Sequence, residues 1–172
     1  MLHLRKIEPT DIPFLYQWEN DAQSWSDSDN HNPLSHQDLR NYIESSTGDI
    51  YRDGQLRLII EDDGQTFGCI DLFDFDPRNR KAAIGMYIAP EARGKGIGKE
   101  TVRQLEEYAF RFLHLRLLYA IIRETNLHCT ALYRSLGYAE VAKLPSWTIE
   151  SAASVWMKTS PITDTPVSKN KS

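Results

Sequence analysis

The sequence predicts a single domain of the mixed α/β class, and three observations support this prediction. The chain has 172 residues, of which 41% are hydrophobic and 26% charged, as is usual for a globular protein with one core. Two helical patterns come early, three strand patterns follow, and the chain then alternates strand, helix, strand, helix and strand. The same composition, without any internal repeat, excludes a disordered chain, a collagen-like repeat and a coiled-coil rod.

The first part of the chain is predicted to be a strand followed by two helices. Apolar and polar residues alternate over residues 2–7, which is typical of a half-buried strand. Thr10 offers a cap and Pro13 an early-helix proline for the first helix, and Ser35 caps the second. Residues 25–33 are rich in Ser, Asp and Asn, so we expect a loop between the helices.

Three strands are predicted next. Residues 55–61 and 66–75 have strand patterns, and the turn sequence Asp62-Asp63-Gly64 joins them. Residues 82–88 form the third strand, which Pro90 ends.

The clearest helix of the chain follows a glycine-rich turn. Its apolar residues recur at three- and four-residue spacing from Val102 to Leu113. The apolar run 117–122 is typical of a buried strand, and Asn126 can cap a short helix that Gly137 ends. Two closing strands are expected at 141–143 and 154–157.

We expect one domain over residues 1–158 and a flexible tail over residues 159–172, where Ser, Thr, Pro and Lys dominate. The net charge of −4 and the pI of about 5.7 give no overall attraction to nucleic acid or to an anionic membrane. The longest apolar run has six residues, whereas a helix that spans a bilayer needs about 20. The sequence therefore predicts neither a nucleic acid nor a membrane as partner.

The start of the chain and its two cysteines indicate a cytoplasmic protein without a metal. No signal-peptide pattern is visible at the N-terminus. Cys69 and Cys129 lack partners at metal-ligand spacing, so we expect two reduced core thiols.

The run Arg93-Gly94-Lys95-Gly96-Ile97-Gly98 lies between a predicted strand and the long helix. Its glycines let a ligand approach the backbone, and the first N–H groups of the helix favour an anion. The run therefore predicts a phosphate or pyrophosphate site, and a tight turn without a ligand is the alternative. The spacing excludes a Walker loop, and Lys99 stands where a Rossmann fingerprint needs its last glycine.

Two motifs together carry a resemblance to a known family. Residues 84–98, from Ile84 to Gly98, resemble the acetyl-CoA-binding segment of the GNAT superfamily of N-acetyltransferases. Asn126, followed by Ala-Leu-Tyr-Arg-Ser-Leu-Gly-Tyr at 131–138, resembles its second signature. Within the superfamily, the chain most resembles the spermidine/spermine and the ribosomal-protein N-terminal acetyltransferases. The resemblance implies a three-layer fold, with a mixed, mostly antiparallel sheet of about six to seven strands and about four helices.

The same resemblance implies acetyl-CoA as cosubstrate and assigns its contacts. The backbone of Met86, Tyr87 and Ile88 would pair with the pantetheine arm. Asn126 would also contact the cofactor, and a plain helix cap is its alternative role. Main-chain N–H groups would hold the pyrophosphate over Arg93, Gly94, Lys95, Gly96, Ile97 and Gly98.

The resemblance also assigns catalytic roles. The departing CoA thiolate needs a proton, and Tyr133 is expected to supply it, since a phenol has a pKa of about 10. A core aromatic at helical spacing is the alternative for Tyr133. Many family members carry a Glu near the position of Ala82 and Ala83, so Asp71 becomes the candidate for substrate anchor or relay base.

Acidic residues in the expected acceptor region indicate a cationic substrate. Asp27 and Asp29 lie in the segment that shapes the acceptor pocket in this family. With Glu44 and Asp71 they would line an acidic cleft, and Asp74 would lie at its rim. Acidic side chains that are merely solvated are the alternative.

Three hypotheses follow. The leading one is direct acetyl transfer in a ternary complex to a small cationic amine, for example a polyamine such as spermidine. The second has a protein N-terminus or lysine as the acceptor. The third is a CoA-binding sensor with little transferase activity, which the missing strand Glu motivates. The resemblance allows a homodimer or a larger homo-oligomer.

Overall fold

The fold is a seven-stranded sheet with helices on both faces, and the computed structural model describes residues 1–27 and 32–162. The strands are β1 (His3–Lys6), β2 (Leu56–Asp62), β3 (Gln65–Asp76), β4 (Lys81–Ile88), β5 (Leu117–Arg123), β6 (Ala139–Leu144) and β7 (Ala153–Thr159). The α-helices are α1 (Ile12–Glu19), α2 (Ala22–Asp27), α3 (His36–Ser45), α4 (Ile50–Asp53), α5 (Ile97–Glu107) and α6 (Leu127–Ser135). Short 3₁₀ turns, η1 (Pro9–Asp11) and η2 (Pro90–Ala92), and a π-helical turn, η3 (Tyr108–Phe112), complete the described elements.

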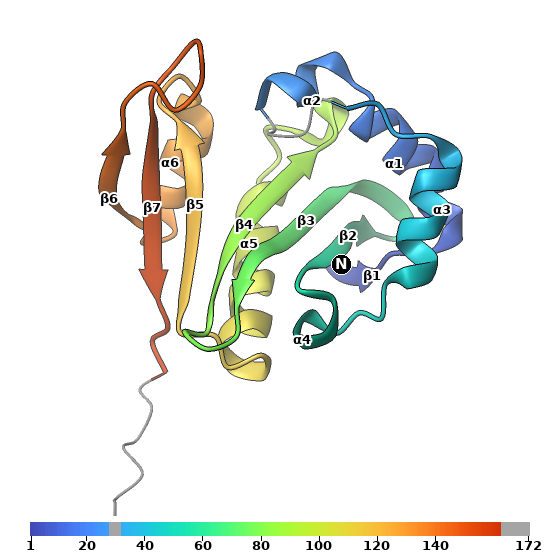
Figure 1. Ribbon diagram of the computed structural model, residues 1–172, viewed down its shortest axis with the longest axis horizontal. Coiled ribbons are helices and arrows are strands. Elements are labelled where there is room, and N and C mark those ends of the chain that lie inside the picture. Colours follow the sequence, from blue (N-terminus) through green and yellow to red (C-terminus); the bar gives the residue numbers. More distant parts are fainter. Residues whose placement is uncertain (28–31, 163–172) are drawn as a thin grey trace, which may run out of the picture.

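The sheet consists of two halves that separate in the middle. Its strand order is β1-β2-β3-β4-β5-β7-β6, and every neighbouring pair is antiparallel except β4 and β5. The parallel pair is joined only where Lys81–Ala83 meets Leu117–Tyr119. Beyond these residues β4 and β5 diverge, as Figure 1 shows, so the sheet opens between them.

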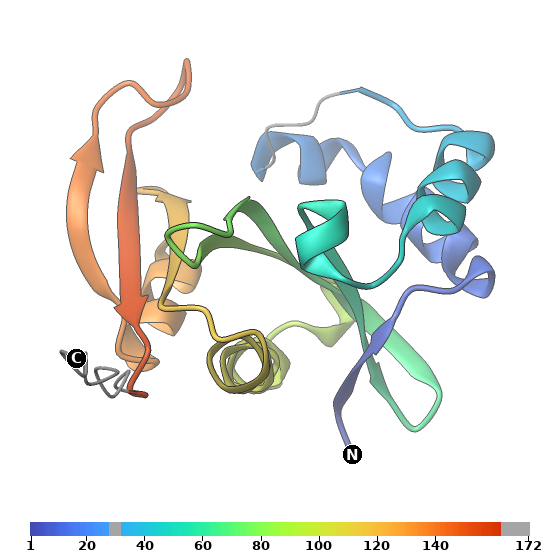
Figure 2. The ribbon, with the colours of Figure 1, turned by 60° about the horizontal axis from the view of Figure 1, so that its bottom comes forward.

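The two faces of the sheet carry different helices and separate apolar clusters. Figure 2 shows α5 near the sheet on the side opposite α1 and α3. The main cluster joins α5 and α6 to the strands, and its members include Ile70, Val102, Leu105, Leu118 and Tyr133. The second cluster joins α1 and α3 to β2 and β3, and it includes Leu15, Trp18, Leu39, Ile59 and Cys69. We call these two sides of the sheet the α5 face and the α1 face.

Local sequence signals set most of the helix ends. Ser35 and Asp38 form a reciprocal capping box at α3, in which Ser35 Oγ accepts from Asp38 N–H at 3.0 Å. Asn126 caps α6, since its side chain accepts from Cys129 N–H at 3.1 Å. Gly137 follows α6 with φ +87°, a conformation that glycine adopts without steric cost.

The predicted fold class is confirmed, with local differences in the helices. Trp25 to Asp27 belong to α2 rather than to a loop, and Trp25 Nε1 donates to Glu19 O at 2.7 Å, a contact across the helix junction. The short helix α4 was not predicted, and it ends at Gly54 with φ +74°. The structure therefore describes more α-helices than the expected four.

The long helix and the chain end also differ slightly from expectation. The helix continues as predicted to Phe112, but its last turn is π-helical, and Leu113 N–H donates to Tyr108 O at 3.0 Å. Thr159, which we expected to begin the tail, pairs with Leu117 as the last residue of β7. Residues 163–172 lie outside the described residues, and the division into a domain and a tail stays a prediction.

Candidate active site

The opening between β4 and β5 exposes one backbone edge of β4. Ala89 N–H donates toward β3, to Phe67 O at 2.8 Å, and peptide groups alternate in direction along a strand. The C=O of Ile84 and both backbone groups of Met86 therefore point into the opening, beyond Ala83 and Tyr119, the last residue pair that joins β4 to β5. An extended ligand can pair with this edge as an added strand.

The three β4 residues predicted to hold a ligand are not equivalent. Tyr87 O points toward β3, because a Cβ placed on Gly68 would lie only 2.0 Å from it. Ile88 faces the opening like Met86, and its C=O accepts from Arg93 Nε at 2.9 Å. The structure thus directs Met86 and the Ile88 N–H into the opening, and it turns the Tyr87 backbone away.

The N-terminus of α5 lies directly beyond the end of β4. Gly96 is its N-cap with φ +78°, and no side chain caps the helix start among the described residues. A Cβ at Gly94 or Gly96 would meet no atom within 4 Å, so this loop is open. The N–H groups of Ile97 and Gly98 carry the positive end of the helix dipole, and the side chain of Lys95 is exposed beside them. This arrangement favours a bound anion such as a pyrophosphate.

Gly98 places the helix start against the opening. A Cβ on Gly98 would lie 3.1 Å from Leu132 Cδ1 and 3.3 Å from Met86 Cε. The first turn of α5 therefore fits between β4 and α6, and a larger residue would push it away from both. Close packing here brings the backbone edge of β4 and the N–H groups of α5 to one site.

Tyr133 lies on α6, on the α5 face of the sheet, in the same cluster as Ile84 and Ala120. Its side chain is 2% exposed, and its ring meets that of Tyr138 edge-on, with the centroids 4.9 Å apart. Burial raises the pKa of Tyr133 well above its usual value, and the nearby Cys129 adds to this. The hydroxyl is therefore protonated at neutral pH, which is the form that a general acid needs.

Asp71 lies on the α1 face and is held by Arg57. Arg57 Nε donates to Asp71 Oδ1 at 2.8 Å, and Arg57 Nη2 donates to Oδ2 at 2.7 Å. The third guanidinium nitrogen pairs with Glu19 at the end of α1, and the guanidinium carbon lies 5.9 Å from the ring centroid of Tyr42. Two carboxylates against one guanidinium leave this cluster with a net charge of −1.

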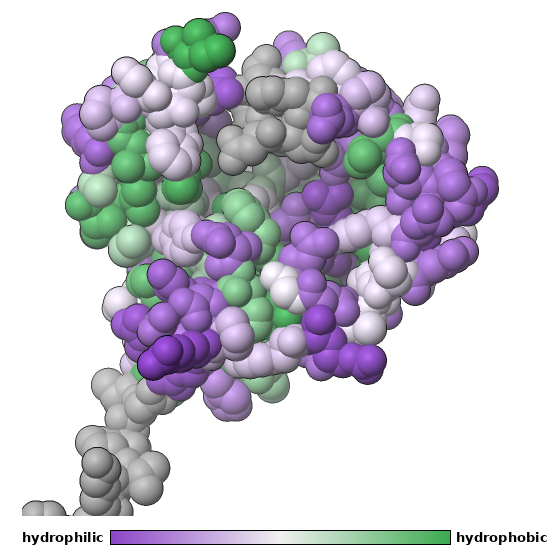
Figure 3. Space-filling view, in the orientation of Figure 1, coloured by the Kyte–Doolittle hydropathy of each residue, from purple (hydrophilic) through white to green (hydrophobic). Residues whose placement is uncertain are grey.

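Asp74 has a different environment at the far end of β3. It lies in the irregular stretch between Phe73 and Asp76, and its φ is +49°. Tyr119 on β5 donates its hydroxyl to Asp74 Oδ2 across β4. In Figure 3 the face of the molecule is hollowed between the half with β5, β6 and β7 and the half with α1 and α3.

The sequence profile of the acetyltransferase (GNAT) domain matches residues 1–139. The chain belongs to this family. GNAT enzymes transfer an acetyl group from acetyl-CoA, and this chain is an N-acetyltransferase of that family. The structure has no helix among the described residues that is long and apolar enough to cross a membrane.

Relatives and solved structures agree with the family. The chain is 27% identical over 144 residues to spermidine N(1)-acetyltransferase of Escherichia coli K12, which covers 82% of this chain and 74% of that protein. It is 38% identical over 81 residues to YdaF of Bacillus subtilis, a candidate ribosomal N-acetyltransferase, over 47% of this chain and 44% of that protein. A structure of spermidine N-acetyltransferase from Vibrio cholerae in complex with CoA and spermine superposes with a TM-score of 0.84 at 22% identity, covering 92% and 95% of the two chains.

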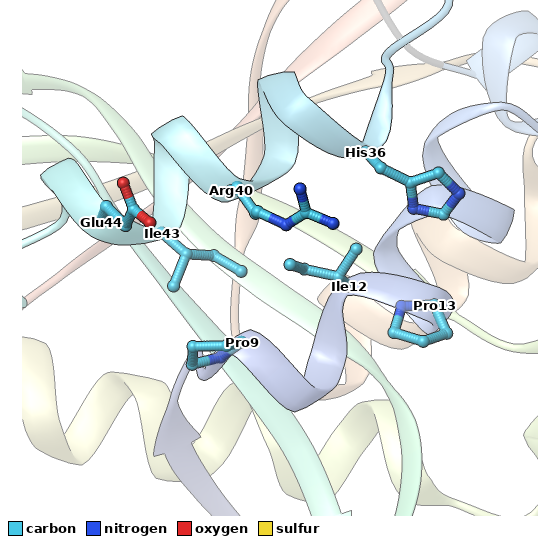
Figure 4. A pocket seen from close by; sticks show the side chains of 7 residues that line it. All are labelled: Pro9, Ile12, Pro13, His36, Arg40, Ile43 and Glu44. Carbon is cyan, nitrogen blue, oxygen red and sulfur yellow. The ribbon is translucent and has the colours of Figure 1, made fainter.

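The structure does not gather all the acidic residues predicted for the acceptor region of this GNAT enzyme. Asp27 ends α2, and Asp29 lies outside the described residues. Glu44 is two positions beyond Tyr42 on α3, about 200° around the helix, so it points away from Arg57. Figure 4 shows Glu44 at one end of a groove of about 400 Å³ between α1 and α3, which is lined by Pro9, Ile12, Pro13, His36, Arg40, Ile43 and Glu44.

Sequence reasoning missed three side chains that contact the candidate carboxylates. Arg57 and Glu19 hold Asp71, and Tyr119 holds Asp74. The cross-strand pair between Arg57 and Asp71 depends on the register of β2 and β3, which alternating patterns alone do not fix. In the described part of the chain, no three His, Cys, Asp or Glu side chains form a group that could hold a metal ion.

Proposed function

We propose that this GNAT enzyme binds acetyl-CoA in the opening between β4 and β5 and acetylates a small cationic amine of the polyamine class, such as spermidine. One observation carries the proposal: the unpaired edge of β4 leads directly to the uncapped N-terminus of α5. An extended amide-containing arm that ends in a pyrophosphate matches this combination of an edge and an anion site.

In this proposal the cofactor is held mainly by the backbone. Met86 and Ile88 pair with the pantetheine arm, while Gly94 to Gly98 enclose the pyrophosphate with their N–H groups. Arg93 and Lys95 add positive charge around the phosphates. The cap residue Asn126 follows the C-terminal end of β5, and in this proposal it contacts the cofactor.

Tyr133 then acts as the general acid. The amine attacks the thioester, and the thiolate that leaves takes the hydroxyl proton of Tyr133. The position of this phenol on α6, in the same apolar cluster as Ile84 of β4, supports this role.

The acceptor approaches from the α1 face. Asp71 and Asp74 stand on either side of Phe73, whose side chain is 42% exposed. Carboxylates separated by an exposed aromatic ring suit a molecule in which ammonium groups alternate with methylene segments. The cluster of Glu19, Arg57 and Asp71 keeps a net charge of −1, which attracts such a cation.

The relatives support the same class of acceptor. Proteins of E. coli and V. cholerae that match over four fifths of this chain are described as spermidine N(1)-acetyltransferases. The similarity to YdaF supports a second candidate, the N-terminus of a ribosomal protein. A V. cholerae relative is described as a dodecamer, so we also propose a homo-oligomer. Neither Cys69 nor Cys129 forms a disulfide, which supports a cytoplasmic location.

The test is release of CoA thiol from acetyl-CoA in the presence of a panel of amines. Saturable turnover is expected with spermidine or spermine, and not with neutral amino acid amides or with a peptide panel. Turnover on peptides alone would move the assignment to the second candidate. Tight CoA binding without turnover on any amine would support a sensor instead.

A further inference from the structure

Acetyl transfer requires an acceptor for the amine's proton as well as a donor for the thiolate. An alkyl amine with a pKa of about 10 is roughly one part in a thousand neutral at pH 7, and the nitrogen becomes positive again when it bonds to the thioester carbon. Ala83, which faces the α1 side at the last pair before the strands diverge, has no group that can take this proton. The acceptor must come from neighbouring elements.

Three carboxylates on the α1 face are candidates, and two of them are already engaged. Arg57 donates to both oxygens of Asp71 and pairs with Glu19, so a guanidinium balances part of their charge. Both oxygens of Asp71 already accept hydrogen bonds from Arg57, so a proton from the amine would have to displace one of these bonds. Asp74 differs from both, since it is exposed and its partner Tyr119 is a neutral phenol.

The position of Tyr119 places Asp74 at the vertex of the opening. Tyr119 pairs with Ala83 in the last residue pair that joins β4 to β5. Leu118 and Ala120 are buried in the main cluster, so the side chain of Tyr119 lies on the α1 face. The carboxylate that Tyr119 holds is therefore on one face of the opening, and Tyr133 is on the other.

We propose that Asp74, held in place by Tyr119, accepts the proton that the acceptor nitrogen loses as acetyl transfer proceeds. This inference rests on the proposed function and names the proton acceptor that it requires. Burial and the hydrogen bond to Asp74 raise the pKa of Tyr119, so Tyr119 keeps its proton and remains a donor to the carboxylate.

The step balances in protons and bonds. The ammonium first loses one proton to water, which frees the lone pair that forms the C–N bond. The nitrogen is then positive and more acidic, and its second proton passes to Asp74 as the C–S bond breaks. Tyr133 protonates the thiolate. Asp74 later releases its proton to water, and Tyr133 regains one, so the products are an amide, a thiol and one proton.

The test compares Asp74→Asn with the parent enzyme from pH 6 to pH 9.5. Asn suits the left-handed backbone at this position, so the variant is expected to fold normally. We expect kcat at pH 7 to fall by about 10²-fold or more, the usual contribution of a general base. The deficit is expected to narrow as pH rises, because hydroxide replaces the carboxylate. Tyr119→Phe is expected to show a smaller loss of kcat, which also narrows as pH rises.

Asp76→Asn is the matched control. Asp76 ends β3 near Asp74, but it accepts hydrogen bonds from Asn79 in the turn, at 2.9 and 2.7 Å, and no role in transfer is assigned to it. The charged groups on β2, β3, β4 and β5 and in the turn after Asp76 are Arg57, Glu61, Asp62, Asp71, Asp76, Arg78, Arg80, Lys81 and Arg123. None of these side chains is a histidine or a cysteine, and all of them are present in both the parent and Asp74→Asn, so they do not change the comparison.

Two results would overturn the inference while the proposed function stands. The first is that the parent is active and the kcat of Asp74→Asn lies within twofold of the parent's kcat. The second is a loss in Asp74→Asn that stays constant across the pH range, which would indicate a structural role. A parent that acetylates no amine would overturn the proposed function itself, and the inference with it.

Discussion

The cofactor side and the acceptor side of the opening are built by different means. On the proposed cofactor side, the candidate binding groups are the edge of β4 and the first N–H groups of α5. On the proposed acceptor side, the candidate binding groups are side chains from separate elements, such as Glu19, Arg57 and Asp71. A backbone site needs only glycines and a helix start in one segment of sequence. A side-chain site depends on which strands and helices meet, and changing one partner alters its charge.

The largest effect that separates the two sides is expected from Tyr133→Phe. The variant keeps the ring against Tyr138 but lacks the proton that the thiolate needs. We expect kcat to fall by about 10²- to 10⁴-fold with unchanged CoA affinity, measured by turnover and calorimetry.

Tyr138→Phe is the control for that substitution. The hydroxyl of Tyr138 is buried near Glu106, and no step of the transfer is assigned to it, so its removal is expected to change kcat by less than about twofold. Equal losses in the two variants would mean that the pair acts through packing, and Tyr133 would not be the acid.

The backbone site is tested by Gly96→Glu. The side chain brings a carboxylate to the place of the pyrophosphate, and we expect the Kd for CoA to rise by about 10²-fold. Gly54→Glu is a matched control, because Gly54 has φ +74° and open space around its Cβ, as Gly96 does. Both variants are expected to lose about 1–2 kcal/mol of stability from the left-handed backbone. A similar loss of CoA affinity in Gly54→Glu would show that strain alone is responsible.

A smaller effect is expected on the acceptor side from Arg57→Met. The side chains of Asp71 and Glu19, which are 24% and 20% exposed, would lose their shared partner. We expect the free energy of unfolding to fall by about 2–3 kcal/mol, less than for a fully buried pair, as measured by urea titration. The Kd for CoA is expected to stay within about twofold, since no cofactor contact changes.

Arg111→Met is the control for Arg57→Met. Arg111 pairs with Glu107 on the surface, with side chains 67% and 63% exposed, so its loss is expected to cost less than about 0.5 kcal/mol. If Arg57→Met weakened CoA binding as strongly as Gly96→Glu, the two sides would not be separate sites.

The division between backbone and side-chain sites explains what could be predicted from the sequence. The caps Ser35 and Asn126 and the glycines before α5 act within a few residues of themselves, so their signals are local. The loop interpretation of Trp25 was wrong, because its Nε1 bonds to Glu19 O across the helix junction and overrides the loop-like composition.

Contacts between distant residues gave no such signal. Arg57 meets Asp71 only in the observed register of β2 and β3, and Tyr119 meets Asp74 only because β3 is irregular there. Single-sequence patterns contain neither fact. For the same reason, the sequence grouped Glu44 with Asp71, whereas α3 turns Glu44 toward a different groove.

Because β4 and β5 pair over so few residues, a bound cosubstrate is expected to stabilise the sheet. Among the described residues, the backbone bonds between β4 and β5 lie around Lys81–Ala83 and Leu117–Tyr119, next to Arg80, whose C=O accepts from the N–H groups of Arg116 and Leu117. At the proposed site, a molecule along the edge of β4 would substitute for the rest of a strand ladder. Binding of acetyl-CoA there and the rigidity of the sheet are then thermodynamically linked. At a concentration of about 100 times its Kd, acetyl-CoA would add about 2.7 kcal/mol to the free energy of unfolding. Amide protons of β4 and β5 should exchange more slowly in the loaded protein, which favours an order of binding in which the acetyl donor enters before the amine.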